Sequence, residues 1–558
     1  MSPDEVSGRS RLDRLDWAVL IAVGLFSSVW SVTAARELGP TFDEPFNIQN
    51  GLEFWRTQNP REFLAAGTLA LSMQVQTLPL YIIESTTGRR WVVATDMSAM
   101  LSVARSVNLL FWWLLLLYVM RLGRALGGAW PGRFSVALVG LEPNFLAHAG
   151  LATADISVTA LLLVSVYHFR AGREAAWGRR IALPGALFGL SILAKLSALI
   201  FGPVAMLLIE LERQLKNSAV ARAWHGDARE RVVNLWRASR AIRWDGVAVI
   251  AIGVVVMVVL SGSGGGPSFQ NTIARMPADN PLRPLLAWLG GLPLFPNGIY
   301  AIWFQFDHNV TGQPTYLVGY EDASSFWFYL PILLSIKLPL ATLGLLAIAL
   351  TVRGPRLKLT VALIAIVLTI GIVMRIQTGI RLVLPLVAFL SIGIAVRMGE
   401  RLRFFSDESR RPSPPAIAVL AALAWLIAGD LRVWPDAVRY TNEFWGHTDN
   451  GYLYVSDSNY DWGQGLPELW EWQASRSAPV TVWYFGTDTR FPSLPRLDAR
   501  TLDPANPLPS GGYLAVGTTV LYGGYTRAAP ARELVLRLRA RLPIARTRTF
   551  LIFDKVAP

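Results

Sequence analysis

Long apolar runs recur along most of the chain, and short polar loops separate them. The first run, WAVLIAVGLFSSVWSVTAA, starts after Asp16. Ten more lie at roughly 99–120, 134–148, 154–169, 181–194, 196–211, 245–261, 326–351, 359–374, 382–397 and 415–429. Judged by apolar length against a hydrocarbon core about 30 Å thick, the pattern predicts a membrane all-α protein with about eleven transmembrane helices. No small-residue cleavage site follows the first run convincingly, so we expect it to be retained as a helix.

The pattern changes after residue 429, where Asp, Trp, Tyr, Gly and Pro become more frequent. The runs VTVWYFG and GYLAVGTTVLY alternate as strands do, and LPELWEWQ has the pattern of a helix. We therefore predict a transmembrane domain over 1–429 and a small α/β domain over 430–558. The stretch SGSGGGP at 261–267 is typical of a flexible exit from the seventh span.

Composition excludes several protein classes. Hydrophobic residues make up 53% of the chain, charged residues only 16%, and the mean hydropathy is +0.38, whereas soluble proteins carry about 25% charged residues. Soluble globular, disordered and collagen-like chains are thereby excluded. The absence of cysteine excludes disulfides, thiol nucleophiles, cysteine-ligated zinc and iron–sulfur clusters.

The net charge of +13 is mainly a signal of membrane topology. Half of the Lys and Arg residues lie in the segments 9–14, 121–133, 170–180, 213–243, 353–358 and 397–411. All six fall on one side of an eleven-span arrangement, which the positive-inside rule makes cytoplasmic. We expect a cytoplasmic N-terminus, outside loops at 36–98 and 262–325, an extracytoplasmic C-terminal tail, and no nucleic-acid partner.

Two adjacent carboxylates, Asp43 and Glu44, follow the first span directly. Neighbouring side chains point in different directions, so one can face a cleft while the other binds an amide, a cation or a metal. The alternative is a helix cap, in which Asp43 before Pro45 only starts an interfacial helix, EPFNIQNGLEFWRT. The sequence leaves the two interpretations evenly balanced.

Further ionisable residues fall on the same predicted outer face. Glu142, His148 and Asp155 lie at or inside the membrane boundary, which favours a functional site over snorkelling and a cap by Asp155. Five basic residues break the positive-inside trend: Arg105, Lys195, Lys337, Arg375 and Arg381. Each could anchor to a lipid headgroup, but together with the carboxylates they indicate an anionic ligand such as a phosphate. A loop with His308 and Asn309 precedes the eighth span.

These motifs, in this order, resemble the polyprenyl-phosphate-dependent membrane glycosyltransferases of the protein O-mannosyltransferase type, bacterial branch, which have the GT-C fold and are related to lipid A aminoarabinose transferases. The resemblance spans nearly the whole chain. It is carried by Asp43-Glu44-Pro45, Ala104-Arg105, Pro143 to His148, Thr153 to Asp155, His308 to Gly319, Trp327 to Pro331, Ile336 to Pro339, Gly379-x-Arg381 with Leu384-Pro385, and Asp457 to Gln464.

The resemblance implies a multi-pass protein of a bacterial inner membrane. It also implies transfer of a sugar from a polyprenyl-phosphate donor to an acceptor hydroxyl, with inversion, outside the cytoplasm. Asp43 would be the general base, with Glu44 beside it, and the acceptor would be a protein, a lipid or a polysaccharide. It implies that Arg105, Lys337, Arg375, Arg381 and Lys195 hold the donor phosphate. Asp155, His148, His308 and Asn309 would bind the acceptor or support the site.

The chain also departs from the family pattern. Phe46 stands where His usually follows Asp-Glu-Pro, and Gln74 and Gln76 stand where the family often has Glu-His-Pro-Pro. These changes leave a divalent metal uncertain and indicate a different acceptor or an inactive member. Two further hypotheses are a lipid-linked sugar transporter, which would show inverted repeats that we do not find, and a catalytically silent scaffold of glycoconjugate assembly.

Overall fold

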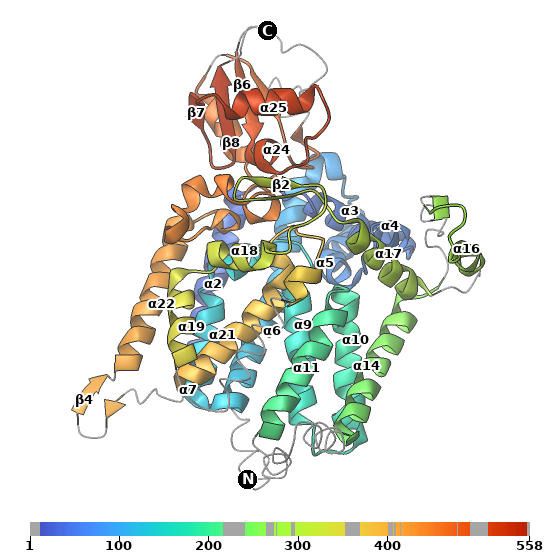
Figure 1. Ribbon diagram of the computed structural model, residues 1–558, viewed down its shortest axis with the longest axis vertical. Helices are drawn as coiled ribbons and strands as arrows, with labels where there is room; N and C mark the ends of the chain where they lie inside the picture. The colour runs from blue at the N-terminus through green and yellow to red at the C-terminus, as the bar shows by residue number, and fades with distance from the viewer. Residues whose placement is uncertain are drawn as a thin grey trace.

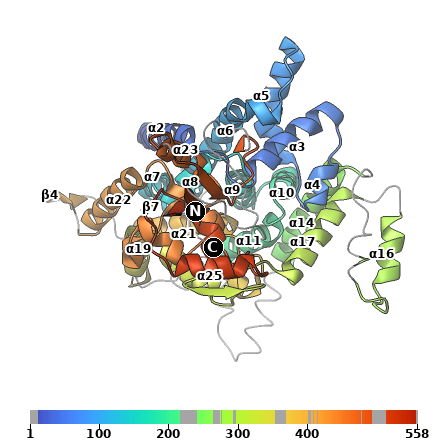
Figure 2. The same ribbon diagram turned by 90° about the horizontal axis from the view of Figure 1, so that it is seen from above.

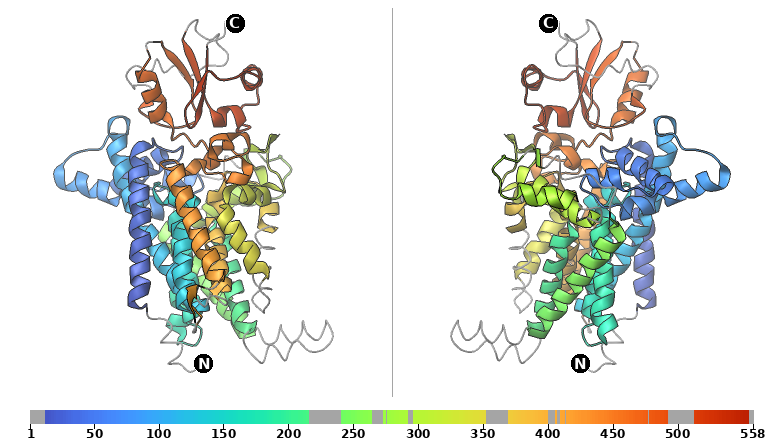
Figure 3. Two further views of the ribbon diagram at one scale, coloured as in Figure 1. Left: turned by 90° about the vertical axis from the view of Figure 1, so that its left-hand side faces the viewer. Right: turned by 90° about the vertical axis from the view of Figure 1, so that its right-hand side faces the viewer.

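A computed structural model describes residues 12–215, 240–263, 273–274, 276–291, 296–351, 369–399, 405–406, 409–412, 414–476, 478–491 and 512–554. Most of the helices run side by side as a bundle. A small domain with a β-sheet lies at one end of this bundle (Figure 1). The start of α2 at Arg14 lies at the opposite end, as the side views show (Figure 3).

Five helices in the described residues are long and apolar enough to cross a membrane. They are α2 (Arg14–Glu37), α6 (Val93–Gly127), α14 (Arg240–Ser261), α21 (Leu384–Gly399) with the 3₁₀ turn η2 (Ile380–Val383) before it, and α22 (Pro414–Val433). A sixth span results if α18 (Tyr329–Lys337) and α19 (Leu340–Thr351) count as one, although the chain bends by 113° between them. The protein is therefore a helical membrane protein with several spans.

By length and composition the described residues contain five or six candidate spans, against the eleven expected, and other apolar runs form helices of 7 to 18 residues. These are α7 (Ala129–Gly140), α8 (Pro143–Ala149), α9 (Asp155–Ala171), α10 (Leu183–Ala194) after a π-helical turn (Gly178–Ala182), and α11 (Ala198–Leu215). A helix of about 12 residues covers only about 18 Å of a core about 30 Å thick. The run 134–148 breaks because Glu142 caps α8 by accepting the N–H of Phe145 at 2.9 Å. The expected span 359–374 lies mostly outside the described residues.

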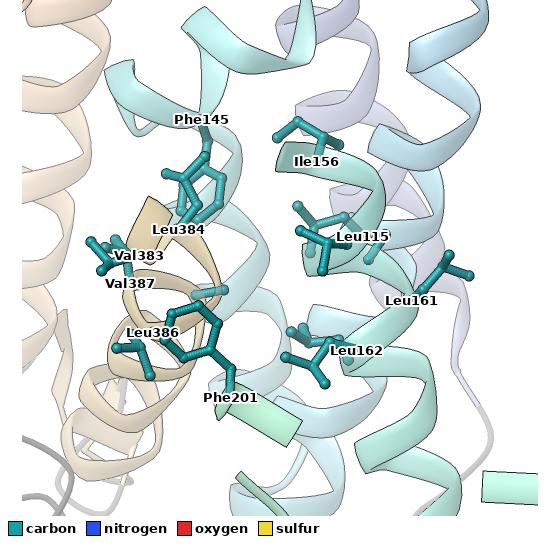
Figure 4. Close-up of a cluster of buried hydrophobic side chains, with 14 of the residues drawn as sticks. Leu115, Phe145, Ile156, Leu161, Leu162, Phe201, Val383, Leu384, Leu386 and Val387 are labelled. Atoms are coloured by element: carbon teal, nitrogen blue, oxygen red, sulfur yellow. The ribbon is translucent and has the colours of Figure 1, made fainter. Parts of the chain in front are cut away.

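The core of the bundle forms where α6, α8, α9, α11 and α21 meet. Figure 4 shows part of this core, with side chains from all five helices interdigitating. The labelled residues are Leu115, Phe145, Ile156, Leu161, Leu162, Phe201, Val383, Leu384, Leu386 and Val387. In lipid such helices associate through van der Waals packing and close approach at small residues. Gly24 of α2 illustrates this, because the Trp113 ring of α6 leaves no space there for a methyl group.

Further helices lie at the end of the bundle that carries the sheet domain, and Figure 2 shows α5 and α16 extending outward from the bundle. They are α3 (Glu44–Thr57), α4 (Arg61–Ala65), α5 (Leu71–Thr87), α16 (Arg283–Gly290) and α17 (Asn297–Thr311), followed by the hairpin β1 (Thr315–Leu317) and β2 (Tyr320–Asp322). The helix that the alternative interpretation placed over EPFNIQNGLEFWRT forms as α3, and its interfacial position stays a prediction. Most of SGSGGGP lies outside the described residues.

The sheet of the C-terminal domain is mixed, with the strand order β5-β6-β8-β7. Its strands are β5 (Val480–Trp483), β6 (Tyr513–Gly517), β7 (Ala545–Arg546) and β8 (Phe550–Asp554), and its helices are α23 (Leu466–Ala474), α24 (Thr518–Tyr522) and α25 (Ala531–Arg539). β5 pairs parallel to β6, and the other pairs are antiparallel. The strand predicted for GYLAVGTTVLY is wrong in its second half, because the chain leaves the sheet at Gly517 and forms α24.

Short 3₁₀ turns connect α22 to this domain: η3 (Ala437–Arg439), η4 (Glu443–Trp445), η5 (Thr448–Leu453) and η6 (Asp457–Asn459).

A hairpin, β3 (Phe405–Ser406) with β4 (Ser409–Pro412), follows α21.

Basic residues form ion pairs at the end of the bundle opposite the sheet domain. Arg133 contacts Asp16 at 2.8 Å and Asp13 at 2.8 Å, and Arg124 pairs with the same two carboxylates. Asp16 is fully buried there. The basic loop 121–133 therefore lies beside the start of α2, at the end away from the sheet domain, while the assignment of that end to the cytoplasm stays a prediction.

Candidate active site

Asp43 lies between α2 and α3 and does not cap α3. It occupies the residue before the helix, but its side chain makes no capping hydrogen bond. Instead, Asp43 Oδ2 accepts a hydrogen bond from Arg381 Nη1 at 2.6 Å, across 338 residues of sequence. The Asp43 side chain is 35% exposed and that of Arg381 is 14% exposed. The interpretation of Asp43 as a helix cap is therefore wrong.

The neighbouring Glu44 has a different environment, because it is fully buried. Its two oxygens accept hydrogen bonds from Arg105 Nε at 2.8 Å and from Arg105 Nη2 at 2.7 Å. The backbone N–H groups of Thr41 and Ala152 also donate to this carboxylate, each at 2.8 Å. Burial raises the pKa of Glu44, but the Arg105 charge and these hydrogen bonds outweigh it, so the pKa lies below its usual value. Glu44 thus fixes the loop, and Asp43 stays accessible.

Arg105 of α6 is almost completely buried, and this loop uses all of its donors. Besides the two contacts to Glu44, its guanidinium donates to the carbonyls of Ala35 at 2.8 Å, Leu38 at 3.2 Å and Gly39 at 2.8 Å. A guanidinium has five N–H groups, and each has a partner here. In this structure Arg105 ties the first loop to α6 and has no free donor for a phosphate.

Arg381 connects Asp43 to the C-terminal domain. Its guanidinium carbon lies 4.2 Å from the centroid of the Trp462 ring, a cation–π contact. Its Nη1 is bound to Asp43, whereas its buried Nε has no hydrogen-bond partner in the described part of the chain. A donor that is held in place but unpaired is suited to an incoming anionic oxygen.

A second ion pair lies in the surroundings of Arg381. Lys195 Nζ, in the turn after α10, contacts Asp155 Oδ1 at 2.6 Å, and Thr153 donates to Asp155 Oδ2 at 3.1 Å. His148 Nδ1 lies 3.9 Å from Asp155 Oδ2, is buried and makes no hydrogen bond. The His148 ring also lies 6.1 Å from the Trp462 ring. The structure thus groups Asp43, Arg381, Asp155, Lys195 and His148.

Asp457 and Tyr525 border this group, although neither was assigned an individual role from the sequence. Asp457 is buried and has a φ of 55°, a left-handed conformation that is uncommon for residues other than glycine. It accepts a hydrogen bond from the Tyr525 hydroxyl and donates its own N–H to Thr519 Oγ1 at 2.8 Å. Burial, and then the nearby Asp43 charge, raise the Asp457 pKa above its usual value, although Arg381 opposes this. Asp457 could have been recognised in the sequence by its place in the polar and aromatic run 457–464.

The C-terminal domain holds the Asp43 loop directly. The N–H of Phe42 donates to the carbonyl of Trp462 at 2.7 Å, and Thr487 Oγ1 donates to the carbonyl of Phe42 at 2.6 Å. The Phe42 ring stacks on Phe485 at 5.2 Å, and Phe485 stacks on Tyr525 at 5.4 Å. The position of Asp43 therefore depends on the docking of this domain.

Replacing Phe485 by alanine is expected to weaken that docking. Each aromatic pair contributes about 0.5–1.5 kcal/mol, so losing both stacks should lower the free energy of unfolding by about 1–3 kcal/mol. Thermal unfolding of the purified protein, with protease sensitivity of the C-terminal domain, measures the effect. The control is Leu542→Ala, since Leu542 lies in the same domain and is 92% exposed; equal shifts in both variants would contradict the role of the stack.

The other predicted site residues lie apart from this group. Lys337 is buried at the end of α18 and donates to the carbonyls of Val438 and Asn459, both at 2.9 Å. Arg375 donates its N–H to Asn309 Oδ1 at 3.0 Å and its Nη1 to the Val310 carbonyl at 2.6 Å. His308 Nε2 lies 3.0 Å from Gln313 Nε2. In the described residues no hydrogen bond or ion pair joins these side chains to Asp43 or Arg381.

The departures from the family pattern have structural partners. Gln76 is buried and donates to Asn108 Oδ1 at 3.0 Å and to the Thr153 carbonyl at 2.8 Å. Phe46 packs edge-on against Phe63 at 6.2 Å. Among the described residues, no three His, Asp or Glu side chains are grouped so that they could hold a metal ion.

The fold and this site define a helical membrane protein in which a small mixed-sheet domain closes over a cluster of ion pairs at one end of the bundle. The sequence matches no protein-family model and no curated protein. Several solved structures are similar, and the three described below all have low identity. ArnT from Cupriavidus metallidurans bound to undecaprenyl phosphate has 15% identity, covering 98% of this chain and 99% of that chain, with a TM-score of 0.46.

The apo state of the same ArnT has 14% identity, covering 97% of this chain and 98% of that chain, with a TM-score of 0.43. The archaeal oligosaccharyltransferase AglB from Archaeoglobus fulgidus, in complex with an inhibitory peptide and a dolichol-phosphate, has 11% identity. It covers 96% of this chain and 74% of that chain, with a TM-score of 0.43.

Proposed function

We propose that this protein is an integral-membrane glycosyltransferase that moves a sugar from a polyprenyl-phosphate donor to a hydroxyl group of an acceptor outside the cytoplasm. One observation carries the proposal: a partly exposed carboxylate, Asp43, is held at 2.6 Å by the fixed cation Arg381 at the end of the bundle that bears the sheet domain. The motif resemblance supports the reaction class, and the geometry supports Asp43 as its base.

In the proposed reaction Asp43 accepts the proton of the acceptor hydroxyl. The hydroxyl oxygen then forms a bond to the anomeric carbon of the sugar, while the bond from that carbon to the phosphate oxygen breaks. The electron pair of the broken bond leaves with the polyprenyl phosphate, and the anomeric carbon is inverted. The base must lie within hydrogen-bond reach of the hydroxyl, which the 35% exposure of Asp43 permits.

The cations beside Asp43 suit the leaving group. Negative charge develops on the phosphate as the bond breaks, and donors that are already in position stabilise it without reorganising. The unpaired Nε of Arg381 is such a donor, and Lys195 supplies a second cation in the same cluster. Under this proposal Arg105 and Glu44 are positioning residues, because they fix the loop that carries Asp43 without facing the ligand.

Mass spectrometry of lipid-linked sugars and glycans tests the proposed function. Cells that lack the gene are expected to lose one glycan and to accumulate one polyprenyl-phosphate sugar, and a gene copy with Asp43→Asn should fail to restore the glycan. Glu53→Gln is the matched control, because Glu53 lies on α3 and is 48% exposed, and it should restore the glycan fully. Identical profiles with and without the gene would overturn the proposal.

A further inference from the structure

A cavity lies where the C-terminal domain meets the linker after α22. Its volume is about 170 Å³, and its lining includes Arg439, Asp449, Tyr460, Glu468, Arg546 and Arg548. These residues come from η3, η5, α23, the β7 strand and the segments beside them. None of them belongs to the cluster around Asp43 and Arg381, so the cavity is a separate place in the molecule.

The three arginines converge on this cavity but are loosely held. Arg439 Nη1 lies 3.4 Å from the Tyr460 hydroxyl and 3.4 Å from the Arg548 carbonyl. Arg439 Nε makes no hydrogen bond within the described residues, and its ion pair with Asp436 Oδ2 is long, at 3.4 Å. Arg546 Nη1 lies 3.3 Å from the Asp449 carbonyl. Arg548 Nε lies 3.9 Å from Glu468. Charge-assisted contacts of arginine are normally about 2.7–2.9 Å, so these donors are not saturated.

The carboxylates near the cavity form only long contacts with the arginine N–H groups. Asp449 is 68% exposed and its carboxylate lies 4.0 Å from Arg439, so water screens its charge. Glu468 Oε2 is occupied by the Arg548 backbone N–H at 2.9 Å. Asp436, behind Arg439 at 3.4 Å, accepts Gln464 Nε2 at 3.0 Å. The contrast with Arg105, whose donors are all used within 3.2 Å, indicates room for another acceptor.

We infer that this cavity binds an oxyanion, a phosphate or carboxylate group, between Arg439, Arg546 and Arg548. Arg439 lines the cavity and is 7% exposed, and a planar guanidinium matches the oxygens of either group. The oxyanion comes from a soluble molecule or from the headgroup of a membrane lipid. The inference depends on the geometry of this cavity and does not require the proposed transfer reaction.

Calorimetric titration of the purified full-length protein with inorganic phosphate, in neutral detergent at constant ionic strength, tests the inference. Wild type should bind, and Arg546→Ala and Arg548→Ala should each weaken binding by about tenfold or more. Arg439→Lys, which keeps the charge but loses the fork, should also weaken it. The control Arg541→Ala removes an exposed arginine of the same domain outside the cavity, and it should bind like wild type.

Two results would overturn the inference: unchanged affinity in both Arg546→Ala and Arg548→Ala, or loss of binding in Arg381→Ala alone, which would place the phosphate beside Asp43. The source of the oxyanion follows from nanodiscs made of phosphatidylcholine with or without phosphatidylglycerol. A lipid headgroup in the cavity would make phosphatidylglycerol suppress phosphate binding, whereas a soluble ligand would give equal affinities. If inorganic phosphate did not bind in nanodiscs of phosphatidylcholine alone, the inference would also be contradicted.

Discussion

Asp43→Asn is expected to lower the rate of sugar transfer by a factor of about 10²–10⁴, the range over which general bases contribute. The amide keeps the size of the side chain and its place beside Arg381, but it cannot accept the proton of the acceptor hydroxyl. Because the Asp43 side chain is 35% exposed but its partner Arg381 only 14%, the free energy of unfolding should fall by about 1–3 kcal/mol. Initial rates in vesicles supplied with the lipid donor measure the loss.

The matched control for Asp43→Asn is Glu53→Gln, which removes the same charge from the helix that follows Asp43. Its side chain is 48% exposed and contacts Arg56 at 3.4 Å, so its transfer rate should equal that of wild type. Wild-type transfer by Asp43→Asn would refute the assignment of the base. An equal loss in both variants would point to the net charge of the loop instead of one proton acceptor.

Arg105→Ala is expected to lower the free energy of unfolding by about 3–5 kcal/mol, since removing one partner of a buried ion pair leaves the other charge uncompensated. The Glu44 side chain is completely buried and would lose two hydrogen bonds. The carbonyls of Ala35, Leu38 and Gly39 would lose their donors as well. Thermal or denaturant unfolding of the purified protein measures the change.

Two further variants distinguish support of the loop from phosphate binding by Arg105. The double variant Arg105→Ala with Glu44→Ala should recover part of the lost stability, because no buried charge remains unpaired. Arg89→Ala breaks an exposed pair with Asp96 at 3.1 Å and should cost at most about 1 kcal/mol. If Arg105→Ala kept its stability but had a raised KM for the lipid donor, Arg105 would instead be a phosphate-binding residue.

The elements next to the site were largely predictable because they depend on local sequence. The interfacial helix α3 begins after Asp43 as the Glu44-Pro45 pair predicts, and α23 falls on LPELWEWQ. The number of spans was not predictable from apolar length, because Glu142 and Pro143 divide one apolar run into two helices. A polar residue within an apolar run decides such a break through its own hydrogen bonds, which hydropathy does not measure.

The site itself was predictable only in part. Adjacency of the two carboxylates indicated a site but left a helix cap as an equal alternative, and the choice depended on Arg381, which is distant in sequence. The basic residues of the outer face looked alike in the sequence. Tertiary packing separates them, since Arg381 and Lys195 join the Asp43 cluster while Arg105 and Lys337 are buried against backbone carbonyls.

The sequence by itself determined the class of this protein, a helical membrane protein with a small domain of strands and helices at its C-terminal end. Apolar length and loop charge suffice for this, because the thickness of the bilayer acts on each segment separately. Only the tertiary structure decided which of two adjacent carboxylates stays accessible. Their environments differ because packing places one beside a buried arginine of α6 and the other beside Arg381 under the C-terminal domain.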